Sequence, residues 1–239
     1  MQFVSAGLTR ICEVRLHVSS EPTDKRPLVL VSNHISYMDT VILAGIMPVC
    51  FTPKLDVASW PAIGSICKIC GCVFVERTPG KIQQTREVLK HTLSNRVVCL
   101  YPEATTGNGL EMHNFKSGFF SLAEEQIDGK DVVIQPVAIV YKGIRGMPID
   151  RSQWPDIAWY GDMDLVPHLW GFLKLSCIDV ELAFLEPVTL SKFDDRKGLA
   201  KHCQRKIADY LEASRGKALM TRRQKSRFSL PFKRSGSQS

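Results

Sequence analysis

The chain alternates short, continuously apolar runs with longer segments in which apolar residues recur at helical spacing. The runs Leu28–Val31, Cys72–Val75, Val97–Tyr101 and Val132–Tyr141 have the length and composition of buried strands. Strands that alternate with helices predict an α/β fold. We therefore expect a single domain with a mixed, mostly parallel sheet flanked by helices. The helical segments are marked by Ile82, Leu89 and Leu93, by Phe115, Phe119 and Leu122 up to Gly129, and by Leu199, Cys203, Ile207 and Leu211.

Two further segments alternate apolar and polar residues with a period of two. In CEVRLHV, Cys12, Val14 and Leu16 alternate with polar neighbours, and the turn-rich SSEPTDKRP follows. This arrangement predicts an antiparallel pair with the run from residue 28, whose strand ends at Ser32. IDVELAFLEPV predicts a half-buried strand in the same way. Residues 143–174, rich in Trp, Pro, Gly and Asp, predict a long excursion from the sheet.

Positive charge is concentrated at the carboxyl end of the chain. The formal net charge is +7, and residues 214–239 contain eight Lys or Arg and no acid, which leaves 23 bases and 24 acids elsewhere. We predict a domain of residues 1–213 followed by a basic, disordered tail of residues 214–239. Interspersed Leu, Met and Phe residues suit an anionic membrane surface, and a merely solubilising tail fits equally well. Nucleic acid is not expected as a partner because no nucleic-acid-binding motif accompanies the tail.

The location of the protein is predicted from hydropathy and cysteine content. The longest charge-free window, Thr40–Pro53, has 14 residues, whereas a bilayer-spanning helix needs about 20. The first residues lack the pattern of a secretory signal, and eight cysteines are too few for a disulfide scaffold, so we expect a reducing cytoplasm. Cys67, Cys70 and Cys72 lack the second pair of ligands that a zinc site needs. We expect buried or free thiols there, and neither a metal nor a cofactor.

The segment SNHISYMDT, directly after the first apolar run, places His34 five positions before Asp39. Residues just beyond strand ends are where α/β sheets bind ligands, and an imidazole beside a carboxylate suits a general base. Ser36 and Asp39 also match a helix capping box, which is a structural role. Both interpretations hold if His34 lies on the loop before the helix, because residues five apart within one helix point about 140° apart.

Two other apolar runs end in residues suited to bind an anion. LYPEATTGNG places Glu103 after a strand, and the hydroxyls of Thr105 and Thr106 with nearby backbone N–H groups suit a phosphate. The same composition is common in ordinary turns. GCVFVERT ends near Arg77, whose planar fork binds phosphate oxygens, although a lone arginine at a strand end is more often a surface ion-pair partner.

Together these blocks resemble the glycerophospholipid acyltransferase family, especially bacterial 1-acyl-glycerol-3-phosphate O-acyltransferases and lyso-ornithine-lipid acyltransferases. The resemblance covers roughly Arg26 to Val188. NHISYMD matches the family's NHxSxxD block, an HX4D motif, and GCVFVERT its arginine block; YPEATTGNG matches the PEGT block and IQPVAIVY the late proline block. Four blocks in the family's order and approximate spacing make coincidence a poor explanation.

The resemblance assigns roles to individual residues. It implies that His34 is the general base and Asp39 its orienting partner. It also implies that Lys54, Arg77 and Glu103 belong to the site for the acceptor's headgroup.

The chain departs from the family's pattern in the block after Glu103. The family usually has glycine where this chain has Ala104, so the loop is strained or reshaped if that position needs a positive φ. Thr105 and Thr106 replace the Arg-Ser of many phosphatidate-forming members. This replacement removes one cation from the expected phosphate site and makes the acceptor less certain.

The implied activity is transfer of a fatty acyl group from an acyl thioester, either acyl-CoA or acyl carrier protein, to the free hydroxyl of a lysolipid. Family frequency favours 1-acyl-glycerol-3-phosphate as the acceptor, giving phosphatidate, with lyso-ornithine lipid or another lysophospholipid as the alternative. We expect peripheral attachment to the cytoplasmic face of the cell membrane. The basic tail could also bind an acidic acyl carrier protein. More distant interpretations are a thioesterase and a non-enzymatic membrane-binding module.

Overall fold

The central sheet brings together strands that lie far apart in the sequence. In the computed structural model its main path runs β1-β9-β7-β2-β4-β3, and the short strands β8 and β10 pair with β7. The structure describes residues 13–60, 67–68, 71–75 and 81–228 with Gly7 and Gly64, and it describes side chains as far as Arg215, apart from Ile82. The strands are β1 (Val14–Ser20), β2 (Leu28–Ser32), β3 (Val49–Phe51), β4 (Val97–Leu100), β7 (Val133–Ile144), β8 (Met147–Pro148), β9 (Ile178–Phe184) and β10 (Val188–Thr189), and a separate hairpin consists of β5 (Gln126–Ile127) and β6 (Lys130–Asp131).

Most neighbouring strands of this sheet are parallel. β2 runs parallel to both β4 and β7, and β3 runs parallel to β4. β9 is antiparallel to β7 and parallel to β1. The mixed, mostly parallel sheet confirms the predicted fold class. Because parallel neighbours end at the same edge of a sheet, the segments that follow β2 and β4 emerge side by side.

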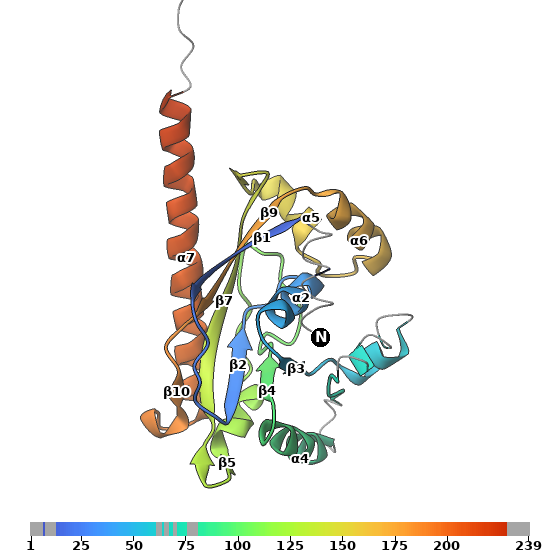
Figure 1. Cartoon of the computed structure of the whole chain (residues 1–239), viewed down its shortest axis with the longest axis vertical. Helices are drawn as coiled ribbons and strands as arrows, with labels where there is room; N and C mark the ends of the chain where they lie inside the picture. Colours follow the sequence, from blue (N-terminus) through green and yellow to red (C-terminus); the bar gives the residue numbers. More distant parts are fainter. Residues whose placement is uncertain are drawn as a thin grey trace, which may run out of the picture.

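Helices cover both faces of the sheet, which explains why β2 is buried along its whole length. α2, α5 and α6 contribute to the core on one face, and α4, η3 and α7 to the core on the other (Figure 1). The helices are α2 (Tyr37–Ile46), α4 (Ile82–Leu93), α5 (Trp154–Ile157), α6 (Leu165–Lys174) and α7 (Arg196–Phe228), and the 3₁₀ turns are η1 (Leu55–Ser59), η3 (Ser117–Glu124), η4 (Arg151–Gln153) and η5 (Leu190–Lys192).

The three segments with helical periodicity are helical, with one difference. Two of them are α4 and α7, and the third is the 3₁₀ helix η3. η3 ends at Glu124, so Gly129 does not close it as predicted. Gly129 instead lies in the turn between β5 and β6 with a φ of +72°, a conformation that glycine adopts without strain.

Three predictions about strands are wrong. Cys72–Val75 is not a strand and contains a single parallel β-bridge, between Val75 and Lys54. β1 does not pair with β2: it lies parallel to β9, with Val14 opposite Ile178. Two-residue periodicity indicates which face of a strand is buried but not which strand lies beside it. β9 is buried at six of its seven positions rather than at every second one, because helical layers cover both of its faces.

The predicted excursion and the predicted tail contain regular structure. β7 continues to Ile144, and β8, η4, α5 and α6 then occupy most of the segment up to Lys174. α7 continues across residue 214 as far as Phe228, and residues 229–239 lie outside the described residues. The division into residues 1–213 and 214–239 stays a prediction.

Within the described part of the chain, no helix is long and apolar enough to cross a membrane, and no group of three or more His, Cys, Asp or Glu is placed to hold a metal ion. Cys67 and Cys72 are partly exposed, and Cys70 lies outside the described residues.

The turn after β4 contains a strained alanine. Ala104 has a φ of +66°, and its backbone N–H donates to the carbonyl of Tyr101 at 3.0 Å. A left-handed conformation costs a residue with a Cβ about 1–2 kcal/mol. The loop has therefore kept the backbone that a glycine would favour, and the alanine adopts it at a cost in stability.

We expect Ala104→Gly to raise the free energy of unfolding by about 1 kcal/mol, because it removes this strain while adding a smaller entropy to the unfolded chain. Urea denaturation measures the change. The matched control is Ala213→Gly at an exposed position in α7, which should lower stability by about 1 kcal/mol. A loss of stability at both positions would contradict the strain at Ala104.

Candidate active site

The candidate site lies where β2 and β4 end side by side. Asn33 and His34 follow β2, and Tyr101, Pro102 and Glu103 follow β4. The chain after His34 turns directly into α2. Three elements thus converge on one short loop at the carboxyl edge of the sheet.

α2 begins with the capping box that its sequence predicts. The side-chain oxygen of Ser36 accepts a hydrogen bond from the backbone N–H of Met38 at 3.3 Å. The carboxylate of Asp39 accepts one from the backbone N–H of Ser36 at 2.9 Å. His34 lies outside the helix, on the incoming loop, so its side chain can turn back towards Asp39.

The imidazole of His34 and the carboxylate of Asp39 are in direct contact. The distance from His34 Nδ1 to Asp39 Oδ2 is 2.9 Å. Because an ionised carboxylate only accepts hydrogen bonds, this contact assigns the proton to Nδ1 and leaves the lone pair on Nε2. The His34 side chain is 18% exposed, whereas that of Asp39 is fully buried. The capping interpretation and the dyad interpretation are therefore both satisfied by the same carboxylate.

Asp39 is held by four hydrogen-bond donors. Oδ2 also accepts from the backbone N–H groups of Ile35 and Ser36, at 2.8 and 2.9 Å. Oδ1 accepts from the hydroxyl of Tyr141 on β7 at 2.8 Å. Burial and the adjacent Asp39 charge hold the pKa of Tyr141 well above its usual range, so this hydroxyl stays a donor.

An aromatic ring supports the other side of the imidazole. The rings of His34 and Tyr101 are stacked, with centroids 3.9 Å apart and planes 11° from parallel. Tyr101 stacks in turn on Phe51 of β3, with centroids 6.3 Å apart. The imidazole is thus held by its hydrogen bond to Asp39 and by the stacking of one ring face on Tyr101, while part of its surface reaches solvent.

Glu103 connects the two loops through backbone groups. One of its oxygens accepts from the N–H of His34 at 2.8 Å and the other from the N–H of His113 at 2.7 Å. The carbonyl of His34 accepts from the N–H of Gly107 at 2.8 Å. Glu103 is only 3% exposed, and burial raises its pKa to about 7 even though both hydrogen bonds favour the charged form.

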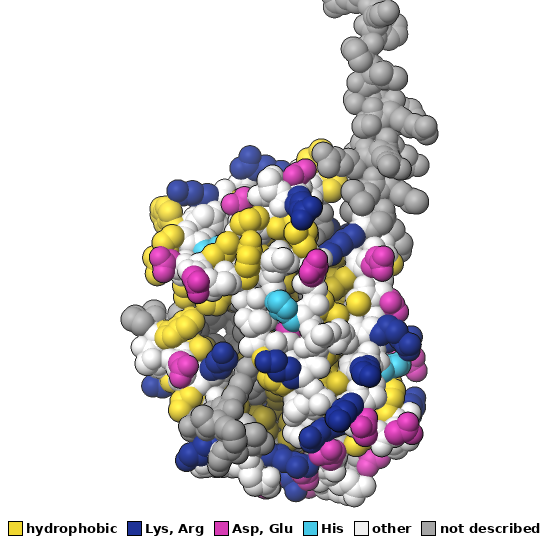
Figure 2. Space-filling model, turned by 180° about the vertical axis from the view of Figure 1, so that it is seen from behind, with side chains coloured by type: hydrophobic (Ala, Val, Ile, Leu, Met, Phe, Trp, Pro, Cys, Tyr) yellow, Lys and Arg dark blue, Asp and Glu magenta, His cyan; other side chains and the backbone are white. Residues whose placement is uncertain are grey.

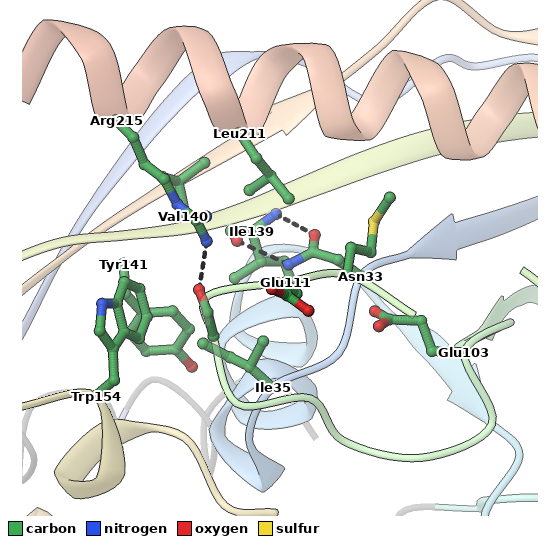
Figure 3. Close-up of a pocket in the computed structure, with 12 residues that line it drawn as sticks. Asn33, Ile35, Glu103, Glu111, Ile139, Val140, Tyr141, Trp154, Leu211 and Arg215 are labelled. Carbon is green, nitrogen blue, oxygen red and sulfur yellow. Dashed lines mark hydrogen bonds between the residues drawn. The ribbon is translucent and has the colours of Figure 1, made fainter. Parts of the chain in front are cut away.

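A residue of α7, Arg215, holds the loop after Glu103 through hydrogen bonds. Arg215 donates to the carbonyls of Gly109 and Leu110, and its guanidinium lies 5.5 Å from the ring centroid of Trp154 (Figure 3). A Cβ on Gly109 would come within 2.3 Å of the Trp154 ring, so only glycine fits there.

The cavity behind these loops is small. It offers ≈ 20 Å³ to water, and Asn33, Glu103, Trp154 and Arg215 are among its lining residues (Figure 3). That volume holds about one water molecule. The cavity is therefore too small for a lipid headgroup, and we interpret it as a gap in the packing that supports the loops.

The structure brings together three of the seven site residues predicted from the sequence, namely His34, Asp39 and Glu103. Lys54 is exposed and follows β3, and Thr105 is exposed in the loop after Glu103, with Thr106 partly buried beside it. Among the described residues, no hydrogen bond or ion pair joins these three to the dyad. Arg77, the seventh, lies outside the described residues.

Several residues that shape the site were missed by the sequence analysis. Tyr141 ends the apolar run of the IQPVAIVY block, and a hydroxyl at the end of a buried strand is the signal that could have indicated it. Asn33 bonds both the N–H and the C=O of Ile139 on β7, at 2.9 and 3.0 Å. Arg215 carries no local signal, because its partners are more than 100 residues away.

Comparisons with known proteins agree with this geometry. A family model described as Acyltransferase matches residues 13–140, more than half of the chain. A lyso-ornithine lipid O-acyltransferase from Brucella abortus is 35% identical over 212 residues, covering 87% of this chain and 79% of that protein. One from Rhizobium meliloti is 34% identical, covering 83% and 70%.

More distant proteins are similar in sequence or in fold. A 1-acyl-sn-glycerol-3-phosphate acyltransferase from Neisseria meningitidis is 25% identical, covering 84% of this chain and 76% of that protein. The crystal structure of the 1-acyl-sn-glycerophosphate acyltransferase PlsC from Thermotoga maritima superposes with a TM-score of 0.61 at 17% identity, over 89% of this chain and 80% of that one. With a family model over residues 13–140, which include the His34–Asp39 dyad, and a relative at 35% identity, the chain belongs to the acyltransferase family.

Proposed function

We propose that the protein transfers a fatty acyl group from an acyl thioester to the free hydroxyl of a lysolipid. The observation that carries the proposal is the 2.9 Å contact between His34 Nδ1 and the buried Asp39 carboxylate, which leaves Nε2 as a base at a partly exposed position. The relatives with the highest identities reported above act on lysolipids by name. Membership of the acyltransferase family supplies the reaction class.

The reaction needs no covalent enzyme intermediate. His34 Nε2 accepts the proton of the lysolipid hydroxyl while that oxygen attacks the thioester carbonyl. Collapse of the tetrahedral intermediate breaks the C–S bond, and the imidazolium returns the proton to the leaving thiolate. Asp39 stabilises the imidazolium in between and holds the ring in the required tautomer.

The acceptor that the relatives favour is lyso-ornithine lipid. The two lyso-ornithine lipid O-acyltransferases are 35% and 34% identical to this chain, and the 1-acyl-sn-glycerol-3-phosphate acyltransferase is 25% identical. The threonine pair after Ala104 points the same way, since it lacks the cation expected beside a phosphate. We therefore place lyso-ornithine lipid before 1-acyl-glycerol-3-phosphate, which reverses the order that family frequency suggests.

The headgroup site is part of the same proposal. Thr105 and Thr106, on the loop that Glu103 and Arg215 hold, are the groups we assign to the acceptor's headgroup, with Lys54 and Arg77 contributed from the neighbouring connection after β3. Glu103 takes a different role, because both of its oxygens accept backbone N–H groups. We assign it to positioning the two loops.

Attachment to the membrane is peripheral in this proposal. The basic segment after Arg215 contacts the anionic surface at the cytoplasmic face of the cell membrane. The donor is acyl-CoA or acyl carrier protein, and both present the same thioester to His34.

Acyl transfer by the purified protein tests the proposed function. We expect diacyl product from a long-chain acyl thioester and lyso-ornithine lipid, and a 10²- to 10⁴-fold lower turnover for His34→Ala. His91→Ala, at an exposed position in α4, is the matched control. Product from 1-acyl-glycerol-3-phosphate instead would replace the acceptor, and free fatty acid alone would show a thioesterase. Unchanged turnover in a folded His34→Ala protein would remove the mechanism.

The raised pKa of Glu103 makes a pH-dependent contribution to stability. The pKa of Glu103 is 4.5 in the unfolded chain and about 7 in the folded protein. Between these two pH values the folded protein binds more protons than the unfolded chain, so the free energy of unfolding falls as the pH rises. Glu103→Gln should be less stable overall, because its NH₂ cannot accept a backbone N–H, but should lack this decline. Urea denaturation from pH 4.5 to 8 measures both, with Glu111→Gln on the exposed part of the same loop as control. Parallel pH profiles for wild type and Glu103→Gln would refute the assignment.

Removing residues 216–239 tests the basic segment while keeping Arg215. The deletion takes away seven Lys or Arg, each contributing roughly 1 kcal/mol near an anionic surface. We expect at least tenfold weaker binding to phosphatidylglycerol-containing vesicles at low salt, and little difference at high salt, where such charges are screened. Vesicle sedimentation gives both values. Equal binding by the two proteins at low salt would exclude this role.

A further inference from the structure

α6 exposes an apolar stripe on the outside of the molecule. Val166, Trp170 and Leu173 are 75%, 64% and 37% exposed, and they follow one another at spacings of four and three residues. At about 100° per residue they fall within roughly 60° of the helix circumference. Phe172, on the opposite side of α6, is fully buried in the core. The helix is thus apolar on its outer as well as its inner face.

The charge on α6 is also distinctive. Lys174 is the one charged residue within Leu165–Lys174, and its Nζ lies 5.5 Å from the centroid of the Trp170 ring. Asp162 and Asp164 precede the helix, and Asp156 of the neighbouring α5 lies close enough to act electrostatically on His168. Tryptophan and lysine on the rim of an apolar face are typical of helices that lie in a membrane interface.

The inner face of α6 leads directly to the candidate active site. His168 Nδ1 lies 3.0 Å from the hydroxyl of Tyr37, and the rings of Phe172 and Tyr37 have centroids 6.3 Å apart. Tyr37 is the first residue of α2, three positions after His34. A surface that binds the outer face of α6 is therefore separated from the start of α2, where the dyad lies, only by α6 itself.

The size of the stripe and its surroundings favour a lipid surface as its occupant. Its three residues expose roughly 350 Å² together, less than half of the ~800 Å² that each partner buries in a stable dimer. Seen from behind, the flank of the body that α6 occupies carries hydrophobic side chains with acidic and basic ones among them (Figure 2). α7, whose last turns are rich in Lys and Arg, extends past the body at the end where α5 and α6 lie (Figure 1). An anionic bilayer complements this combination of apolar and basic groups.

We propose that α6 is an interfacial helix, which inserts Val166, Trp170 and Leu173 into the surface of a lipid bilayer and so holds the active site against the membrane. The proposal rests on the proposed function for its purpose, since a lysolipid acceptor resides in a bilayer. The contact itself is apolar, so it persists at high salt and on neutral lipid.

Vesicle binding by the full chain tests the proposal. Val166→Gln, Trp170→Gln and Leu173→Gln are combined, because glutamine is polar and a good helix former. We expect at least tenfold weaker binding to neutral phosphatidylcholine vesicles and to phosphatidylglycerol-containing vesicles in high salt. The one-for-one control compares Val166→Gln with Val88→Gln, at a 45% exposed position in α4 on the other face of the sheet, which should bind as the wild type does.

The outcomes separate the surface from the reaction. Thermal unfolding verifies that the triple variant is folded, and Trp170→Gln alone replaces it otherwise. Unchanged vesicle binding overturns the proposal even if acyl transfer occurs. Lost vesicle binding supports it even if no acyl transfer is found, and this result would leave only the proposed function in error. A change in oligomeric state by light scattering, with vesicle binding unchanged, would show that a second copy covers α6 and would overturn the proposal.

Discussion

The hydrogen-bonded carboxylate of Asp39 is the group on which the arrangement of the site depends. It is fully buried, and an unpaired carboxylate in that position would be strongly unfavourable. Donors from the imidazole of His34, from two backbone N–H groups of the loop and from Tyr141 on β7 satisfy both of its oxygens. Its place in the first turn of α2 also favours negative charge there. The loop has little freedom to move without leaving one of these groups unpaired.

A second buried carboxylate extends this constraint to the neighbouring strand. Glu103 binds the N–H of His34 and that of His113, so the loops after β2 and β4 share one set of hydrogen bonds. The two carboxylates differ in what they hold. Asp39 contacts a titratable ring, which fits the proposed proton transfer, whereas Glu103 accepts hydrogen bonds from backbone N–H groups, which fits the proposed positioning of the loops. Arg215 of α7 adds a third contact, through its hydrogen bonds to the carbonyls of Gly109 and Leu110.

The two surfaces assigned to membrane contact rely on different physical forces. The outer face of α6 offers apolar area, whose transfer from water depends little on salt. The segment after Arg215 offers positive charge, whose attraction to anionic lipid is screened within a Debye length. Each surface is linked to a part of the site, α6 through Tyr37 and α7 through the loop that carries Gly109.

The sequence by itself determined several of the elements and the local chemistry of the helix cap. Apolar runs and helical periodicity located β2, β4, β7, α4 and α7, and the capping pattern at Ser36 and Asp39 located the start of α2, because these signals arise from neighbouring residues. Tertiary structure decided the rest. Which strand lies beside β1 depends on register and layer order, which a two-residue period does not encode. The φ of Ala104, the bond from Tyr141 to Asp39 and the clamp from Arg215 each depend on groups that only the folded sheet and its helices bring together.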